Sequence, residues 1–217
     1  MDTHTDELLG ATWIAADDMI IRWIRQTRQS FEPHTTPWML EQIEQRAGAY
    51  VDVGASTGWF AVPFAMRGRE VIAFECNPRA IQRLKDNCAL NNVSITLFEN
   101  AASNKAGPVT FTHNPRWPLT SGGSLERVAA NKASETVTAV RLDDVIDAPV
   151  ALLKIDVEGH EISVLEGAER LIAASRPAMV LEANTSHHKD MLAAWLDAHD
   201  YGYSVSDKRN LLCLPRS

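Results

Sequence analysis

The fold of this chain is decided by the stretch Val51-Asp52-Val53-Gly54-Ala55-Ser56-Thr57-Gly58. A short apolar strand is expected to lead into it at Ala49 to Val53, and a helix is expected to follow at Trp59 to Arg67. Glycines let the backbone turn sharply here and let a ligand approach without meeting a Cβ atom. The start of the following helix offers unpaired N–H groups. The stretch therefore predicts a ligand-binding turn, with a tight strand-to-helix turn that binds nothing as the alternative.

Strand and helix patterns alternate after this turn, which predicts a mostly parallel sheet covered by helices on both faces. Residues 6–48, before the turn, are expected to be helical. Residues 1–48 would then form a short N-terminal helical extension, and residues 49–217 one α/β domain. The later strands are expected at Glu70 to Glu75, Ser94 to Phe98, Pro108 to Thr112, Thr136 to Arg141, Ala151 to Ile155 and Ala178 to Glu182, the helices at Pro78 to Asn91, Ile162 to Ala174 and His188 to His199, and a hairpin at Tyr203 to Leu214.

The composition of the 217 residues is that of an ordinary globular domain, with 45% hydrophobic and 23% charged residues. The net charge of −7 at pH 7 argues against binding of duplex nucleic acid, because neutralising phosphates requires clustered Lys and Arg. Cys76, Cys88 and Cys213 fit no metal motif, and they predict reduced thiols in a cytoplasmic protein. No apolar run approaches the ~20 residues that span a bilayer, so no membrane span is expected.

A second acid supports a nucleotide site. Glu75 closes the second expected strand, about 20 residues after Gly54, where nucleotide-binding βαβ units hold the two ribose hydroxyls. A solvated acid at a strand end is the alternative. The glycine pattern departs from the dinucleotide fingerprint G-x-G-x-x-G, because Ser56 stands where the second glycine belongs.

The pattern Asp52-x-Gly54-x-x-x-Gly58 instead resembles the first motif of the class I methyltransferases. The resemblance implies that the glycine turn holds the methionine part of S-adenosylmethionine, that Glu75 holds the ribose, and that Asn100 or the backbone beside it contacts adenine. Trp59 is expected to pack beneath the cofactor. The residues expected to bind the cofactor are Asp52, Gly54, Ala55, Ser56, Thr57, Gly58, Glu75, Cys76, Asn77, Asn100, Ala101 and Asp156.

A more specific resemblance begins at Leu153-Lys154-Ile155-Asp156-Val157-Glu158-Gly159-His160-Glu161, which leads into Val164-Leu165-Glu166-Gly167. This segment is similar to one of the FkbM family of methyltransferases, and the similarity covers roughly Phe31 to Glu182. It implies methyl transfer from S-adenosylmethionine, usually to oxygen. It also implies a three-layer α/β/α Rossmann-like fold, with a seven-stranded sheet and an antiparallel last strand. Cys76 stands where the family often has proline, and Ser56-Thr57 replaces a common Asn-Ile.

Candidate catalytic groups follow the later strands. Asp156 ends one apolar strand and Glu182 the next, so both should edge the crevice that holds the cofactor. We expect Asp156 to position or deprotonate the acceptor, with Glu158, His160 and Glu182 as secondary candidates. Glu158 capping the next helix and His160 as a surface residue are the alternatives. These acids could also bind a divalent cation through oxygen ligands.

The acceptor side is less well defined. Arg116 and Trp117 lie in a Pro-rich loop that also contains Ser124, and they could meet an anionic or sugar-like acceptor. Trp117 clamping the loop to the core is the alternative. His187 could line the same side, although the sequence favours an exposed loop position. The N-terminal segment could cover the cofactor or form a homodimer face, whereas Glu161 and Glu166 are expected on a solvated helix face.

The function predicted from these features is O-methylation of a hydroxyl on a small metabolite or sugar-containing acceptor, with S-adenosylmethionine as the donor. N-methylation and a noncatalytic subunit that binds S-adenosylmethionine are the alternatives. An NAD-dependent oxidoreductase is disfavoured because the dinucleotide fingerprint and a Tyr-x-x-x-Lys pair are both absent from the sequence.

Overall fold

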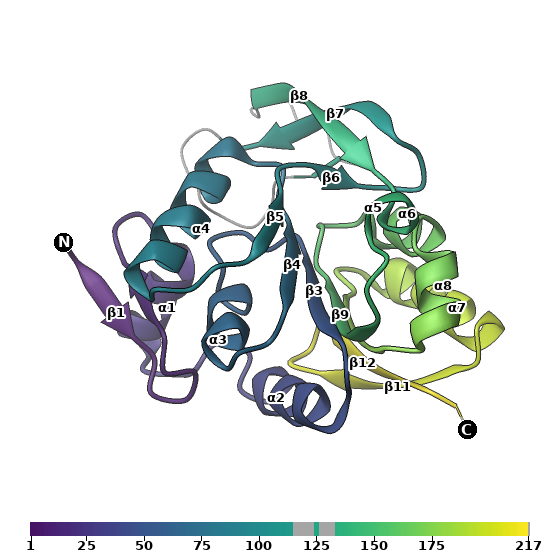
Figure 1. The fold of residues 1–217 in the computed structure, drawn as a ribbon, viewed down its shortest axis with the longest axis horizontal. Coiled ribbons are helices and arrows are strands. Elements are labelled where there is room, and N and C mark those ends of the chain that lie inside the picture. The colour runs from purple at the N-terminus through teal and green to yellow at the C-terminus, as the bar shows by residue number, and fades with distance from the viewer. Residues whose placement is uncertain (115–123, 126–132, 217) are drawn as a thin grey trace.

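The computed structural model describes residues 1–114, 124–125 and 133–216. Its centre is a seven-stranded sheet with the order β11-β12-β10-β9-β3-β4-β5 (Figure 1). All neighbouring strands from β10 to β5 are parallel, and β12 is antiparallel to both of its neighbours. The strands are β3 (Ala49–Val53), β4 (Val71–Phe74), β5 (Thr96–Phe98), β9 (Val150–Ile155), β10 (Ala178–Glu182), β11 (Tyr201–Ser206) and β12 (Asn210–Pro215). The predicted α/β class and the antiparallel last strand are thus confirmed.

Helices cover both faces of this sheet (Figure 1). One face packs on helices from the first half of the chain, and the other on helices from the second half, with a separate apolar cluster in each layer. The first group is α1 (Met19–Thr27), α2 (Thr35–Gln45), α3 (Ala61–Met66) and α4 (Pro78–Leu90), and the second is α5 (Leu142–Val145), α6 (Glu161–Glu166), α7 (Glu169–Ser175) and α8 (Ser186–Ala198). The five residues of β3 are all buried, as expected for a central parallel strand.

A small second sheet with the order β6-β8-β7 stands beside the main one. Its strands are β6 (Ala101–Ala102), β7 (Gly107–His113) and β8 (Ala133–Val140), and β7 and β8 are antiparallel. Arg116 and Trp117 fall in the connection between β7 and β8, outside the described residues. The predicted roles of these two residues therefore stay predictions.

The N-terminal region differs from the expected helical extension, because it begins with a β-hairpin of β1 (Thr3–Thr5) and β2 (Thr12–Ile14). The hairpin packs on α4, where Asn87 and Asn91 accept the backbone N–H groups of Ile14 at 3.0 Å and Thr12 at 2.8 Å. These side-chain partners come from residues more than 70 positions away. The local spacing of apolar residues was therefore a poor guide to this segment.

The predicted helix from Ile162 to Ala174 is in fact two helices, α6 and α7. Gly167 ends α6, and a Cβ atom at this position would overlap the backbone carbonyl of Ser103. The helix is interrupted at Gly167 because the end of α6 lies directly against the β6–β7 segment.

No helix in the described part of the chain is long and apolar enough to cross a lipid bilayer.

Candidate active site

A pocket opens at the carboxyl edge of the main sheet, where β4, β3, β9 and β10 end. It gathers most of the residues expected at a cofactor and catalytic site. Those on its wall are Asp52, Gly54, Ala55, Ser56, Thr57, Glu75, Cys76, Asn77, Asn100, Ala101, Ser124, Asp156, Glu158 and Glu182. This is the edge at which open α/β sheets bind ligands.

The glycine turn owes its shape to close packing. Gly54 has φ +83°, and a Cβ atom there would overlap the backbone carbonyl of Asp156. Gly58 has φ +88°, and its Cβ would overlap the Leu84 side chain of α4. Glycine at both positions therefore lets the turn lie against the end of β9 and against α4. Gly58 lies against α4 and is not among the described residues that line the pocket.

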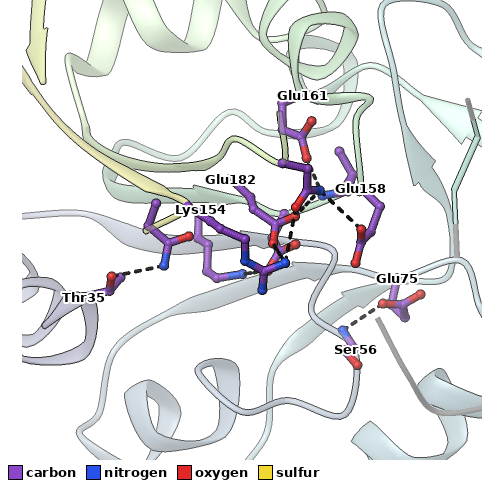
Figure 2. Close-up of polar contacts among 12 residues, drawn as sticks. Thr35, Ser56, Glu75, Lys154, Glu158, Glu161 and Glu182 are labelled. Atoms are coloured by element: carbon purple, nitrogen blue, oxygen red, sulfur yellow. Dashed lines mark hydrogen bonds and ion pairs between the residues drawn. The ribbon is translucent and has the colours of Figure 1, made fainter. Parts of the chain in front are cut away.

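Glu75 ties the glycine turn to the start of α4. Its Oε2 accepts the Ser56 N–H at 2.8 Å (Figure 2), and its Oε1 accepts the N–H groups of Cys76 at 2.9 Å and Asn77 at 2.8 Å. Burial raises the pKa of this carboxyl, while the three N–H groups favour its charged form. A carboxylate offers about four lone-pair positions, so Glu75 keeps acceptor capacity toward the pocket.

Four polar residues on neighbouring strands point to the same face of the sheet at this edge, because side chains alternate along a strand. Asp52 lies opposite Lys154 in the β3–β9 pair, and Asp156 follows Lys154 by two positions. Glu182 ends the next strand, β10. The sheet register therefore assembles a cluster of acids around one lysine.

Lys154 is the centre of this cluster and was given no role in the sequence analysis. It is only 4% exposed, and its Nζ lies 2.8 Å from Oδ2 of Asp156 (Figure 2). Burial opposes its charge, but the charges of Asp156, Asp52 and Glu32 outweigh burial and raise the pKa of Lys154. The signal in the sequence was a charged residue inside an apolar strand, two positions before Asp156.

The acids Asp156 and Glu182 are held in different states. Burial opposes ionisation of Asp156, but Lys154 lowers the pKa of its carboxyl. Burial, together with the charges of Asp156 and Glu158, raises the pKa of Glu182 to about 9. Glu182 accepts a hydrogen bond from Asn184 Nδ2 at 2.8 Å and lies 3.1 Å from Arg209 Nη1. The pair therefore favours an ionised Asp156 beside a protonated Glu182 at neutral pH.

Glu161 stabilises the loop after β9. It is fully buried, whereas the sequence predicted a solvated position. Its carboxylate accepts the N–H groups of Val157 and Gly159, each at 3.0 Å, and Oε2 lies 3.1 Å from Nε2 of His188. Glu158, between these two N–H groups, has a left-handed backbone with φ +57° and faces the pocket. Glu161, rather than Glu158, is the acid in the first turn of α6.

His160 and His187 lie apart from this cluster. The His160 ring nitrogen Nε2 is 2.9 Å from Oγ of Ser103, which links the loop to the β6–β7 segment. His187 is exposed on the first turn of α8, where its neighbour His188 turns inward to Glu161. Neither His160 nor His187 is among the described residues that line the pocket.

The predicted neighbours of adenine and acceptor are arranged as follows. Asn100 is half-buried at the pocket and donates from Nδ2 to the Thr138 carbonyl at 3.2 Å. Ser124 donates from Oγ to the Glu158 carbonyl at 3.1 Å. Trp59 lines the pocket and stacks on Trp13, with the ring centroids 4.3 Å apart.

The carboxylates of Asp156, Glu158 and Glu182 each offer an oxygen within 4.8 Å of the others, as a cation site requires. Two of these acids already contact cationic groups, Asp156 at Lys154 and Glu182 at Arg209. The arrangement is therefore that of an internally neutralised cluster as much as that of a metal site, and the predicted divalent cation stays a prediction.

Known proteins resemble this chain in sequence or in fold. The hexuronic acid methyltransferase AglP of Haloferax volcanii is 26% identical over 133 residues, which are 59% of this chain and 53% of that protein. The methyltransferase FkbM from Methylobacillus flagellatus superposes with a TM-score of 0.58 at 22% identity, over 77% of this chain and 43% of that chain. The tRNA (uracil-54, C5)-methyltransferase of Pyrococcus abyssi, solved with S-adenosyl-L-homocysteine, superposes with a TM-score of 0.51 at 12% identity, over 99% and 44% of the two chains.

The chain thus spans about half the length of these relatives. The two solved structures are 22% and 12% identical to it, and they show a shared fold. The family model of the methyltransferase FkbM domain matches residues 52–205, which include the glycine turn, Glu75 and the segment around Asp156. The resemblance expected from the sequence is confirmed, and this chain belongs to the methyltransferase FkbM domain family.

Proposed function

We propose that this chain transfers a methyl group from S-adenosylmethionine to a hydroxyl group of a sugar-containing or other small acceptor. The observation that carries the proposal is one pocket that combines the Gly54 turn, Glu75 and the acids at the ends of β9 and β10. The charge of this pocket is appropriate, because S-adenosylmethionine carries a sulfonium and acids outnumber cations among the described residues of the pocket wall. The acidic residues there are Asp18, Glu32, Asp52, Glu75, Asp156, Glu158 and Glu182, and the cationic ones are Lys154 and Arg209.

The cofactor supplies the electrophilic methyl group, and the chain must hold the acceptor oxygen in line with the bond that breaks. Asp156 is our candidate for this task. Lys154 keeps its carboxylate ionised, so that it can accept a hydrogen bond from the acceptor hydroxyl and take its proton. Glu182, which favours its protonated form, can donate a hydrogen bond to another oxygen of the acceptor.

A sugar acceptor is supported by the relative from Haloferax volcanii, whose name states that it methylates a hexuronic acid. The described pocket residues also favour an acceptor that is rich in hydroxyl groups, since carboxylates and amides there can accept several hydrogen bonds. Lys154 and Arg209, the two cations among the described pocket residues, are both engaged with acids, so recognition of a uronate carboxylate there would require Arg209 to release Glu182.

Two successive experiments test the proposal. Titration of the purified chain in a calorimeter should show saturable binding of S-adenosylmethionine, weakened in Glu75→Ala, and no binding of NAD in a parallel titration. Transfer from methyl-labelled S-adenosylmethionine should then be measured on neutral sugars, uronic acids and a primary amine. Turnover on the amine alone would favour N-methylation, and binding without turnover on any acceptor would favour a noncatalytic subunit.

Asp156→Asn separates catalysis from binding. We expect this variant to bind S-adenosyl-L-homocysteine normally and to lose about 10²-fold or more in turnover, within the range that general bases contribute. Full turnover of Asp156→Asn would overturn the assignment of the base. Activity that vanishes with EDTA and returns with Mg²⁺ would show instead that the three-acid cluster holds a cation.

A further inference from the structure

Three polar atoms on the pocket wall are buried and make no hydrogen bond within the described part of the chain. They are Oε2 of Glu32, Oδ1 of Asp52 and Nε1 of Trp59. Buried polar groups in folded proteins are almost always paired. Unpaired buried atoms on residues that line a pocket therefore point to a ligand that supplies their partners.

The three atoms form a chemically matched set. The two carboxylate oxygens accept hydrogen bonds, and the indole N–H can only donate one. An α-amino acid offers the complementary pair, an ammonium group that only donates and a carboxylate that only accepts. The methionine end of S-adenosylmethionine is such a group, whereas its adenosine end carries neither charge.

The positions of these atoms agree with this match. Glu75, the candidate for the ribose, directly follows β4, and Asp52 lies on the adjacent strand β3. Lys154, beyond it on β9, pairs directly with Asp52. Figure 2 shows Glu75 and Ser56 apart from the group around Lys154 and Glu182. A ligand anchored by its ribose at Glu75 would therefore reach Asp52 and Lys154 with its other end.

Glu32 is presented to the pocket by a constrained segment before α2. Its backbone is left-handed, with φ +47°, and its carbonyl accepts the Thr36 N–H at 3.0 Å. The neighbouring Phe31 ring packs edge-on against Trp59, with the ring centroids 5.8 Å apart. Left-handed backbone is unfavourable for a residue with a Cβ atom and is often retained where function needs it.

We propose that Glu32 binds the α-ammonium group of S-adenosylmethionine together with Asp52, while the Trp59 N–H donates to its carboxylate. This inference rests on the proposed function. Glu32 precedes the residues matched by the family model, so the match does not assign it a role.

The protonation of Glu32 supplies an independent readout. Burial raises the pKa of Glu32 to about 7, and the charges of Asp156 and Asp207 also raise it, whereas Lys154 and the nearby Asn210 side chain lower it. A bound ammonium favours the ionised form of Glu32, so binding near pH 7 should release a proton and should tighten from pH 6 to pH 8. Burial also raises the pKa of Asp52, to about 6, so Asp52 contributes mainly at the acid end of this range.

The test compares two ligands on the full chain by calorimetry. S-Adenosyl-L-homocysteine carries the amino-acid group, and 5′-methylthioadenosine carries the same nucleoside without it. Glu32→Gln should weaken binding of S-adenosyl-L-homocysteine about tenfold or more, as expected for loss of a hydrogen bond between charged groups, and should leave 5′-methylthioadenosine within about twofold. Trp59→Phe, which keeps an aromatic ring but removes the N–H, should weaken the first ligand alone. Glu44→Gln, at an exposed position of α2, is the matched control.

Repeating the titrations in two buffers of different ionisation enthalpy counts protons. We expect proton release at pH 7 with S-adenosyl-L-homocysteine, and little release in Glu32→Gln or with 5′-methylthioadenosine. Equal weakening of both ligands, or none, would overturn the assignment while leaving the proposed function in place. Weakening of S-adenosylmethionine alone would assign Glu32 to the sulfonium and also overturn it. A folded wild-type chain that binds neither amino-acid ligand would overturn the proposed function and this inference together.

Discussion

Replacing Glu161 by alanine should destabilise the protein by about 3–5 kcal/mol. The Glu161 carboxylate is fully buried, accepts two backbone N–H groups at 3.0 Å and lies 3.1 Å from Nε2 of His188. The substitution would leave both N–H groups and the histidine without this partner inside the protein. Each unsatisfied buried group costs about 1–3 kcal/mol, so the two N–H groups and the lost histidine contact together give a loss of about 3–5 kcal/mol.

Urea unfolding measures this loss as a shift of the midpoint at constant slope. Glu161→Gln keeps an acceptor oxygen for the loop N–H groups, so we expect it to lose about half as much stability as Glu161→Ala, roughly 1.5–2.5 kcal/mol. Glu44→Ala, at an exposed position of α2, should change stability by no more than about 0.5 kcal/mol. A loss below about 1 kcal/mol for Glu161→Ala, with the slope unchanged, would refute the reasoning that this carboxylate holds the loop.

The same substitution carries a functional expectation. The loop that Glu161 braces bears Asp156 and Glu158, whereas the glycine turn and Glu75 lie on other elements. Glu161→Gln should therefore reduce turnover more than it reduces affinity for S-adenosyl-L-homocysteine. An equal loss of both, measured on folded protein, would show that the loop also holds the cofactor.

Three further outcomes are expected. Gly54→Ala should abolish binding of S-adenosyl-L-homocysteine in calorimetry and destabilise the fold by more than about 1 kcal/mol. The reason is that this position has φ +83° and a Cβ would overlap the Asp156 carbonyl. Normal binding would contradict the close packing of Gly54 against Asp156. Glu182 has a folded pKa of about 9, above its unfolded value, so its contribution to stability is full below about pH 4.5 and is lost as the pH rises through 9. Urea midpoints from about pH 5 to about pH 9 should therefore fall more steeply in wild type than in Glu182→Gln. Parallel curves for the two proteins would contradict this expectation. Lys154→Met should lower the free energy of unfolding by about 3–5 kcal/mol, since it leaves buried acids without their cation. A stabilised variant in the same urea assay would show instead that the acids take up protons without cost.

Local patterns were enough to predict the main sheet and many of the residues that line the pocket. Continuous apolar runs marked β3 and β9, and the strand order placed Asp156 and Glu182 at the edge that holds Gly54. The same reasoning failed at the N-terminal hairpin, whose backbone partners are Asn87 and Asn91 of a distant helix. It also failed at Glu161, because a charged residue near a helix start resembles a solvated one until its partners are known.

The sequence by itself determined the fold class, the glycine turn and the family, because alternating strand and helix patterns and a motif at a strand end are local properties of the chain. Only the tertiary structure decided which polar groups meet. It brought Glu32 from the N-terminal segment to the acids around Lys154, turned His160 to Ser103, and buried Glu161 against His188. The reason is physical: these contacts join segments far apart in the chain, and they form only when the apolar faces of the helices and the sheet pack together.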